Sequence, residues 1–285
     1  MEQYDILIIG GGAAGIAAAK AAKDAKVLLV DRKAALGGVL LQCAHRGFGK
    51  NKSGPEYVAS LIRDFPDTVH LALNTTVLSL SKEKTALLSG RDFGRKEVTF
   101  SQLILSTGCR EIPVGALPIG GTRPKGVYTA GQMQEMMNLH GLIPEGPVVI
   151  LGSGDLGLIM AKQLAESGLS VTLVEKQSCC GGMARNQKCL TEFPIQLICG
   201  DTVAEVHGYP RITGCTTASG TTLHCKTLLT AAGLVPEREL ILGLEDCDWL
   251  HICGNCNAVH PMVEAVVNEG KQAGLAAYEQ LRGSL

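Results

Sequence analysis

The chain has 285 residues, of which 46% are hydrophobic and 19% are charged, a composition typical of a globular protein with a large core. Its formal net charge of −1 argues against nucleic acid or an anionic membrane surface as a partner. The sequence has no apolar run near the ~20 residues that cross a bilayer and no secretory signal, so we expect a cytoplasmic protein.

The first predicted strand, residues 4–9, runs into a glycine-rich turn. Gly10, Gly12 and Gly15 follow in the order G-x-G-x-x-G, and an alanine-rich helical run comes next. In this pattern the first glycine permits a tight turn, the second lets a pyrophosphate approach the backbone, and the third lets the helix pack against the strand. The helix N-terminus then faces the phosphates with its positive end.

A second strand is predicted at 27–30 and ends at Asp31. A carboxylate at this position can bind a ribose 2′-hydroxyl. Strand, glycine turn, helix and terminal acid together predict a dinucleotide-binding domain. A glycine-rich loop that binds nothing is the alternative.

Short elements alternate through the next part of the chain. We predict a helix at 55–65 and strands at 69–73, 77–80, 85–88, 97–100 and 103–105, with hairpin turns at Gly90 and Gly94. Ser106, Thr107 and Gly108 follow the last of these strands. A connector rich in Gly and Pro covers 111–126, and a helix is predicted near 130–140.

The opening pattern then starts again. A strand at 147–151 leads into a second glycine fingerprint, 152–157, and a helix to about residue 166. A strand at 171–174 ends at Glu175, so the acid has a counterpart as well. The segment that ends at Gly233 also resembles the one that ends at Gly108. This repeat predicts two dinucleotide-binding domains, the second inserted into the first.

Near the end of the chain we predict a strand that begins at Trp249 and turns at Cys253, Gly254 and Asn255. A helix is predicted to start at Pro261, because proline suits the first helical position. This segment is expected to return to the first domain and complete it. The predicted domains are therefore 1–112 with 247–285, and 113–246.

Eleven cysteines are scattered along the chain. No C-x₂-C pair is followed by a second pair at zinc spacing, so we expect no metal site and mostly reduced, buried thiols.

The layout resembles the pyridine-nucleotide-disulfide oxidoreductase superfamily, flavoproteins with two dinucleotide domains, in its short thioredoxin-reductase-like form. The resemblance implies an α/β fold of two Rossmann-like, three-layer ββα domains without the C-terminal dimerisation domain of longer members. It implies FAD in the first domain and NAD(P)H in the second. The implied FAD-site residues are Gly10, Gly12, Ala13, Ala14, Gly15, Asp31, Arg32, Gly37, Gly38, Gln42, Val77, Ser106, Thr107, Gly108, Gly254, Asn255 and Val263. The implied NAD-site residues are Gly152, Ser153, Gly154, Asp155, Leu156, Gly157, Glu175 and Gly233.

A narrower resemblance rests on residues 37–49, 54–57, 108–111 and 121–124. These segments are similar to bacterial FAD/NAD oxidoreductases that accompany a glycerol-3-phosphate-dehydrogenase-like flavoprotein and a small cysteine-rich protein. Related subunits occur in opine, proline and cyanide-forming amine dehydrogenase complexes. The resemblance implies a hetero-oligomer in which this chain passes electrons between NADH and a second flavoprotein subunit or an iron–sulfur protein.

The sequence departs from the family at several points. The family's late Gly-Asp is Gly254-Asn255 here, although an amide can still bond a hydroxyl. The redox pair C-x₄-C is missing from the loop after Gly38, where Cys43 stands alone. Hydride exchange between nicotinamide and flavin N5 does not strictly need an acid or a base from the protein.

Cys43 and His45 are the candidate catalytic residues. A thiolate near the flavin would be a redox centre activated by an adjacent imidazolium, and a buried cysteine with a loop histidine is the other interpretation. Cys253 and Cys256 form a C-G-N-C motif that is either a working disulfide or a flavin-binding turn. A vicinal disulfide between the adjacent Cys179 and Cys180 is a further hypothesis.

Glu175 favours NADH over NADPH, since a carboxylate accepts a 2′-hydroxyl and repels a 2′-phosphate, whereas Lys176 works against this preference. Three functions follow. The first is an electron-transfer subunit that uses FAD and NADH. The others are a free-standing thiol or disulfide reductase that uses Cys43 or the Cys253/Cys256 pair, and a non-catalytic nucleotide-binding scaffold.

Overall fold

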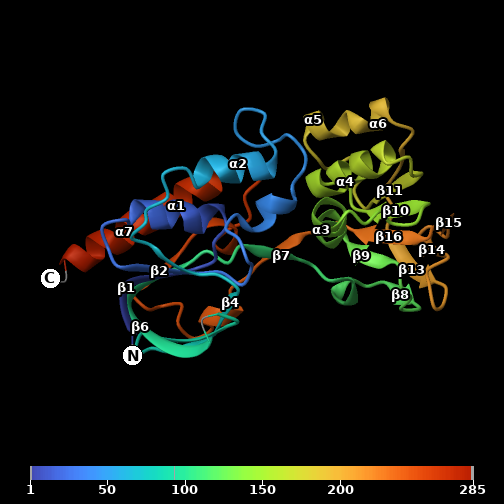
Figure 1. Cartoon of the computed structure of the whole chain (residues 1–285). Coiled ribbons are helices and arrows are strands. Elements are labelled where there is room, and N and C mark those ends of the chain that lie inside the picture. The colour runs from blue at the N-terminus through green and yellow to red at the C-terminus, as the bar shows by residue number, and fades with distance from the viewer. Residues whose placement is uncertain (1, 93, 284–285) are drawn as a thin grey trace. The chain divides into compact units, whose positions relative to one another are not determined.

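The computed structural model describes residues 2–92 and 94–283. The chain divides into two compact units, one of residues 1–110 with 235–285 and one of residues 111–234 (Figure 1). The second unit is inserted into the first, as the repeat predicted.

The first unit is built on a mixed sheet in the order β3-β2-β1-β6-β5-β4, with β18 also paired to β6. The strands are β1 Glu2–Ile9, β2 Val27–Val30, β3 His70–Ala72, β4 Thr75–Leu80, β5 Thr85–Gly90, β6 Gly94–Leu105 and β18 Leu250–Ile252. β1, β2, β3, β6 and β18 run parallel, whereas β4 and β5 join β6 as an antiparallel meander.

The two strands predicted at 97–100 and 103–105 are one strand, β6. β1 pairs with it from Glu2, opposite Val98, to Ile9, opposite Leu105. This continuous ladder holds the chain extended through Ser101, where the sequence alone indicated a break.

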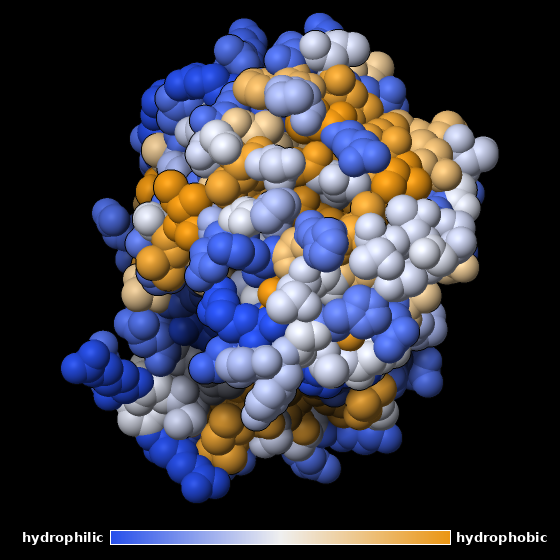
Figure 2. All heavy atoms as spheres, turned by 90° about the vertical axis from the view of Figure 1, so that its right-hand side faces the viewer, coloured by the Kyte–Doolittle hydropathy of each residue, from blue (hydrophilic) through white to orange (hydrophobic). Residues whose placement is uncertain are grey.

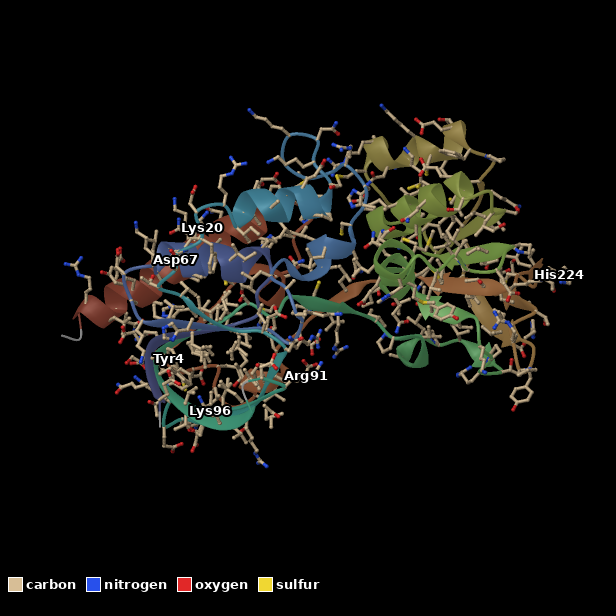
Figure 3. All side chains as sticks on the ribbon, in the orientation of Figure 1. Tyr4, Lys20, Asp67, Arg91, Lys96 and His224 are labelled. Carbon is tan, nitrogen blue, oxygen red and sulfur yellow. The ribbon has the colours of Figure 1, made fainter. Side chains whose placement is uncertain are left out.

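Helices cover one face of this sheet. They are α1 Ala13–Ala21, α2 Gly54–Leu61 and α7 Val263–Gly283, and the short 3₁₀ turns of the unit are η1 Gly38–Gln42, η3 Glu239–Ile241 and η4 Gly254–Cys256. The predicted helix at 55–65 ends at Leu61. Lys20 in α1 donates from Nζ to the carbonyl oxygens of Leu61 and Arg63, at 3.0 and 2.6 Å, and ties α2 to α1 (Figure 3).

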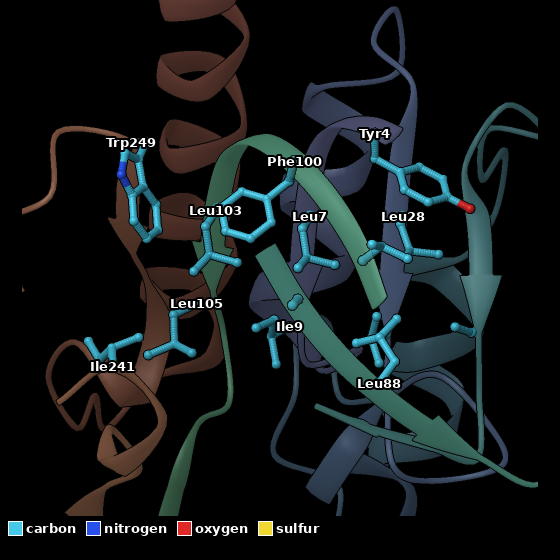
Figure 4. Close-up of a cluster of buried hydrophobic side chains, with 14 of the residues drawn as sticks. Tyr4, Leu7, Ile9, Leu28, Leu88, Phe100, Leu103, Leu105, Ile241 and Trp249 are labelled. Carbon is cyan, nitrogen blue, oxygen red and sulfur yellow. The ribbon is translucent and has the colours of Figure 1, made fainter. Parts of the chain in front are cut away.

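The other face of the sheet buries a second layer of apolar side chains (Figure 4). Leu105 lies there with Trp249, and Ile241 and Leu244 belong to the same cluster. The boundary predicted at 246/247 is therefore wrong. The chain re-enters the first unit at 234/235, and Ile241 and Leu244 are buried in the core of that unit.

The second unit repeats the three layers with its own cores. A parallel sheet runs β12-β11-β10-β16-β9, and a smaller sheet runs β15-β14-β13-β8. The strands are β8 Gly120–Gly121, β9 Val127–Thr129, β10 Val148–Leu151, β11 Val171–Glu175, β12 Gln196–Cys199, β13 Val203–His207, β14 Gly214–Thr217, β15 Thr222–His224 and β16 Thr227–Thr230. Its helices are η2 Val114–Ala116, α3 Ala130–His140, α4 Asp155–Glu166, α5 Ala184–Gln187 and α6 Cys189–Glu192.

The parallel strands of the two units have the same order, but their edge strands come from opposite directions along the chain. In the first unit β18 follows the rest of the sheet in sequence, whereas in the second unit β9 precedes the fingerprint strand β10. Each edge strand leads to a helix, α7 or α3. Where the chain passes between the units, β7 Cys109–Glu111 pairs with β17 Leu234–Pro236.

Across the described ranges, we find no helix with the length and apolar character that a bilayer crossing requires. The face shown in Figure 2 carries hydrophobic patches between hydrophilic side chains. Among the exposed apolar residues of the second unit are Leu139, Leu142 and Ile143, which follow one another closely at the end of α3.

Candidate functional site

The three glycines of the first fingerprint have three different surroundings. Gly10 has a φ of +106°, and a Cβ there would lie 2.4 Å from the carbonyl oxygen of Ser106. A Cβ on Gly15 would lie 1.8 Å from the oxygen of Gly10. A Cβ on Gly12 would meet nothing within 4 Å, so open space lies in front of the N-terminus of α1. We call this opening, with Asp31 beside it, the first cradle.

The second fingerprint repeats this geometry. Gly152 has a φ of +104°, and its Cβ would lie 2.5 Å from the oxygen of Ala231. A Cβ on Gly157 would lie 2.1 Å from the oxygen of Gly152, and one on Gly154 would again meet nothing within 4 Å. This opening in front of α4, with Glu175 beside it, is the second cradle. Both cradles leave room where a pyrophosphate meets the backbone in this motif.

The two terminal acids make equivalent hydrogen bonds. Asp31 accepts from the N–H of Gly11 at 2.5 Å and from that of Lys33 at 2.7 Å. Glu175 accepts from Ser153 N at 2.7 Å and from Gln177 N at 2.9 Å. In each unit the carboxylate is thus fixed between the fingerprint turn and the chain that follows the acid.

Glu175 has an additional donor, because the hydroxyl of Ser153 also bonds its Oε2 at 2.7 Å. Burial by itself would raise the pKa of Glu175, but the backbone donors of Gln177 and Ser153, together with this hydroxyl, outweigh it and hold the pKa below the usual value. The acid at the second cradle is therefore ionised at neutral pH and can accept a ribose hydroxyl.

Gly181 and Gly182 line the second cradle, as Gly38 lines the first. They are not among the residues predicted for the site. A Cβ on Gly38 would lie 3.2 Å from Gly12 Cα, and one on Gly181 would lie 3.9 Å from Gly154 N. Gly181 N also donates to Ser153 Oγ at 3.0 Å. The signal was present in the sequence, since Gly181-Gly182 follow Glu175 at the same spacing as Gly37-Gly38 follow Asp31.

The C-terminal turn reaches the first cradle. A Cβ on Gly254 would lie 2.8 Å from Cβ of Ala14, in the first turn of α1. Asn255 accepts at Oδ1 from His260 N at 3.0 Å, and His260 pairs through Nε2 with Glu269 Oε1 at 2.7 Å. Glu269 Oε2 also accepts from Gly254 N at 2.8 Å.

These bonds correct the predicted start of the last helix. Pro261 lies in the loop, and α7 begins at Val263. His260 bonds both Asn255 and Glu269, and Glu269 lies in α7. These contacts hold the loop before Val263 against the helix, so the loop does not form part of it. Val263, the first residue of α7, packs in the same cluster as Ala13.

Ser106, Thr107 and Gly108 are also predicted for the first cradle. Ser106 bonds the glycine turn, whereas Thr107 and Gly108 bond Glu237. Ser106 Oγ donates to the oxygens of Gly10 and Ile9 at 2.8 and 3.0 Å. Thr107 Oγ1 donates to the carbonyl oxygen of Glu237 at 2.6 Å, and Glu237 N donates to Gly108 O at 3.0 Å.

The other residues predicted for the first cradle are Gln42, Arg32 and Val77. Gln42 ends η1, and exposed Arg32 directly follows Asp31. Val77 lies in β4, two residues after Thr75, whose N–H bonds the backbone oxygen of Asp31 at 3.0 Å. In the second unit Gly233 O accepts from Ile112 N at 3.1 Å, two residues after Ala231.

Cys43 is buried, with 8% of its surface exposed, and its Sγ donates to Val39 O at 3.3 Å. Burial raises the pKa of its thiol to about 12. The ring of His45 packs against Phe48, with centroids 4.9 Å apart. A thiol with so high a pKa is a weak nucleophile at neutral pH.

The cysteines of the C-G-N-C motif are buried on opposite sides of the sheet, Cys253 under the helices and Cys256 in the core beneath the meander. Both sulfurs donate to the carbonyl oxygen of Leu105, at 3.7 and 3.2 Å. Burial raises the pKa of the Cys253 thiol. This arrangement matches a packed turn.

All eleven cysteines are thiols in the structure, Cys179 and Cys180 included. Over residues 2–92 and 94–283, no three or more His, Cys, Asp or Glu side chains are placed to hold a metal ion.

A buried threonine hydroxyl close to the second cradle is a further candidate for contact with a ligand. Within the part of the chain that the structure describes, Thr230 Oγ1 is a buried side-chain oxygen without a hydrogen-bond partner. Thr230 ends β16, one residue before Ala231 and at the carboxyl end of the sheet, where the second cradle opens. Buried hydroxyls are normally bonded, so this oxygen is suited to a ligand or a bound water.

Comparison with known proteins agrees with this geometry. Residues 4–249 match the model of a family described as pyridine nucleotide-disulphide oxidoreductase. The chain therefore belongs to that family, whose members are oxidoreductases that bind FAD and NAD(P)H.

Two relatives are named as components of larger enzymes. The chain is 32% identical over 197 residues to hydrogen cyanide synthase subunit HcnB of Pseudomonas protegens, covering 66% of this chain and 41% of the relative. It is 33% identical over 180 residues to an opine oxidase subunit of Agrobacterium tumefaciens, covering 58% of this chain and 35% of the relative. The chain thus spans less than half the length of either relative.

The fold is similar to that of thioredoxin reductase from Lactococcus lactis, with a TM-score of 0.81 and 19% sequence identity. The match covers 98% of this chain and 99% of the other. The predicted α/β fold of two Rossmann-like domains is thereby confirmed.

Proposed function

We propose that this chain is an electron-transfer subunit that exchanges hydride between NADH and FAD and passes electrons between the flavin and a partner dehydrogenase. One observation carries the proposal, namely that the same cradle, open at the same glycine, occurs once in each unit. A single cradle would bind one nucleotide, whereas hydride exchange needs a donor and an acceptor.

In the first cradle the N-terminus of α1 would face the pyrophosphate of FAD, and Asp31 would accept a ribose hydroxyl. The N-terminus of α7, which begins at Val263 beside Ala13, would stabilise negative charge on the flavin. FAD bound there would supply the ring that exchanges hydride with a nicotinamide.

In the second cradle Glu175 would bind the adenosine ribose of NADH. Its ionised carboxylate would repel the 2′-phosphate of NADPH, so we propose NADH as the preferred nucleotide.

An anaerobic absorbance spectrum of the purified protein tests this function. We expect a flavin spectrum that NADH bleaches and NADPH bleaches more slowly. Gly154→Asp should keep the flavin and lose bleaching by NADH, while dithionite still bleaches it. A colourless protein that takes up no FAD contradicts the proposal, and a flavin that NADH leaves unbleached favours the non-catalytic scaffold.

The partner proposal draws on the relatives, which are named as subunits. We propose a second flavoprotein dehydrogenase and a small cysteine-rich or iron–sulfur protein as partners. Co-purification from the native host under anaerobic conditions should recover them in fixed ratio with this chain. Recovery of this chain alone as an active NADH oxidoreductase would contradict the assembly.

A thiol or disulfide reductase is the second candidate, because the fold is that of thioredoxin reductase. Cys43→Ser separates the two. Since the Cys43 thiol is buried with a raised pKa, we expect NADH-to-dye activity within about twofold of the unmodified protein. Loss of a disulfide reductase activity in this variant, with dye reduction intact, would instead support the second candidate.

A further inference from the structure

The two cradles differ in the residue that begins the helix. In the first cradle this residue is Ala13, and in the second it is Asp155, which starts α4 directly after Gly154. The N-terminus of a helix attracts anions, because its free N–H groups and the macrodipole present positive charge. A carboxylate attached at that point repels a phosphate that approaches the same helix end.

The carboxylate of Asp155 is fixed in place. Its Oδ1 accepts from Met183 N at 2.8 Å and from Asn186 Nδ2 at 2.6 Å. A Cβ on Gly182 would lie 3.2 Å from both Asp155 N and Asp155 Oδ1, so the Gly-Gly loop packs directly over this helix end. The charge therefore cannot swing away when a nucleotide arrives, unless the loop moves with it.

The charge is also uncompensated by a cation. Over residues 2–92 and 94–283, no Lys, Arg or His lies within 4.0 Å of the Asp155 carboxylate. Arg185, which lies between Met183 and Asn186 in sequence, is exposed to solvent. Glu175 adds a second negative charge to the same cradle, whereas the first cradle has Asp31 alone.

We infer that Asp155 sets the affinity of the second cradle by repelling the pyrophosphate of its dinucleotide, so that this nucleotide exchanges rapidly while the first cradle retains its own. The inference rests on the proposed function, in which the second cradle takes NADH. Asp155 is thus a specificity-determining residue that favours ligands with less phosphate charge. At the effective dielectric of a partly exposed site, one charge a few ångströms from a phosphate changes the dissociation constant roughly tenfold.

Asp155→Asn tests the inference, because the amide keeps an oxygen for Met183 and Asn186 and removes only the charge. The dissociation constant of NADH, measured by calorimetry on the flavin-loaded protein at low ionic strength, should fall roughly tenfold. The difference from the unmodified protein should shrink in 0.5 M salt, added to screen the charge, at a Debye length of about 4 Å. Binding of adenosine, which carries no phosphate, should not change.

Glu166→Gln is the matched control. Glu166 is the last residue of α4, so this substitution removes the same charge from the far end of the same helix and should leave NADH binding unchanged. Asp155→Ala copies the first cradle and should tighten NADH as well, even though it also removes the two hydrogen bonds. Thermal melts of both Asp155 variants report on folding independently of binding.

An unchanged or weaker NADH affinity in both Asp155 variants overturns the inference and leaves the proposed function standing, provided the unmodified protein binds NADH. Equal tightening of adenosine and NADH also overturns it, because the carboxylate then acts on the shape of the cradle and not through charge. If neither the unmodified protein nor any variant binds NADH, both the inference and the proposed use of the second cradle fail.

Discussion

Gly12 and Gly154 stand apart from the other fingerprint glycines, because a side chain on either would enter open space. Their backbones are also ordinary, with φ values of −76° and −63°. Any residue can adopt these angles, so folding alone does not require glycine there. What the two positions keep clear is the entrance of each cradle.

This contrast makes a paired prediction. Gly12→Asp should fold normally, because aspartate is a favourable N-cap, but its carboxylate should reduce FAD retention at least about tenfold. Gly15→Ala should instead destabilise the fold by about 1–3 kcal/mol or more, since its Cβ would lie 1.8 Å from the oxygen of Gly10. Flavin content and thermal melting of the two variants measure these effects. Normal flavin content in Gly12→Asp would contradict the location of the first cradle.

Asp201 gives the second unit a specific response to acid. Its Oδ2 accepts from Ser219 Oγ at 2.6 Å, and hydrogen bonds from Ser219 and Thr217 lower its pKa to about 2. The folded pKa lies below the unfolded one, so the ionised group contributes stability that is present above pH ~4 and lost as pH falls toward about 2. Asp201→Asn should therefore be less stable to urea at pH 6, and the gap should narrow below pH ~4 and close as the pH approaches about 2. A gap that is constant with pH would contradict this linkage.

Much of the candidate site could be predicted because its signals are local. The glycine order and the acid that ends the second strand are each read within about 25 residues, and the structure places them as the spacing implies. The covering Gly-Gly loop of the second unit was equally readable from its spacing. The contacts of His260 with Glu269 could not be predicted, since a loop that folds back on a helix leaves no periodic pattern.

Among the elements, α1 and α7 pack closely, and glycines of α7 permit it. A Cβ on Gly270 would lie 2.2 Å from the oxygen of Ala14, and one on Gly274 would lie 2.4 Å from that of Ala18. α7 thus packs directly against α1 and supports the helix whose N-terminus forms the first cradle.

Gly270→Ala tests this packing. In an exposed helix the change would stabilise by up to about 1 kcal/mol, but here we expect net destabilisation, because overpacking costs about 1–3 kcal/mol. Urea denaturation measures the sign. Asn268→Ala, at an exposed position of the same helix, is the control and should be neutral or stabilising. A stabilised Gly270→Ala would show that the two helices can separate at little cost.

Element boundaries were predictable where capping or a terminal glycine marks them. α3 covers the predicted stretch and has a capping box at Thr129 and Gln132 and a left-handed Gly141 at its end. The sequence analysis assigned the segment 235–246 to the second unit. In the structure its apolar residues pack with Leu105, which is remote in sequence, and with Trp249, which follows the segment. Only the assembled core decides such a segment.

At the scale of the whole molecule, the two units repeat one sheet with the edge strand supplied from opposite directions of the chain. The second unit is a continuous stretch, 111–234, with its own cores. The first unit consists of two stretches, and neither contains the full sheet.

This asymmetry predicts different behaviour of the excised pieces. Residues 111–234 expressed alone should unfold cooperatively, because every strand and helix of their sheets is present. Residues 1–110 alone lack β18 and α7 and should not give a cooperative melt. Circular dichroism on heating compares the two. A cooperative transition for 1–110, or none for 111–234, would contradict the division.

The pairing of β7 with β17 has a consequence for engineering this chain. The polypeptide leaves the first unit and rejoins it along two paired strands, so the second unit is one continuous segment that could be exchanged as a whole. Under the proposed function, replacing the segment between Arg110 and Val235 with another nucleotide-binding domain should change the nucleotide bound there and leave both stretches of the first unit in place.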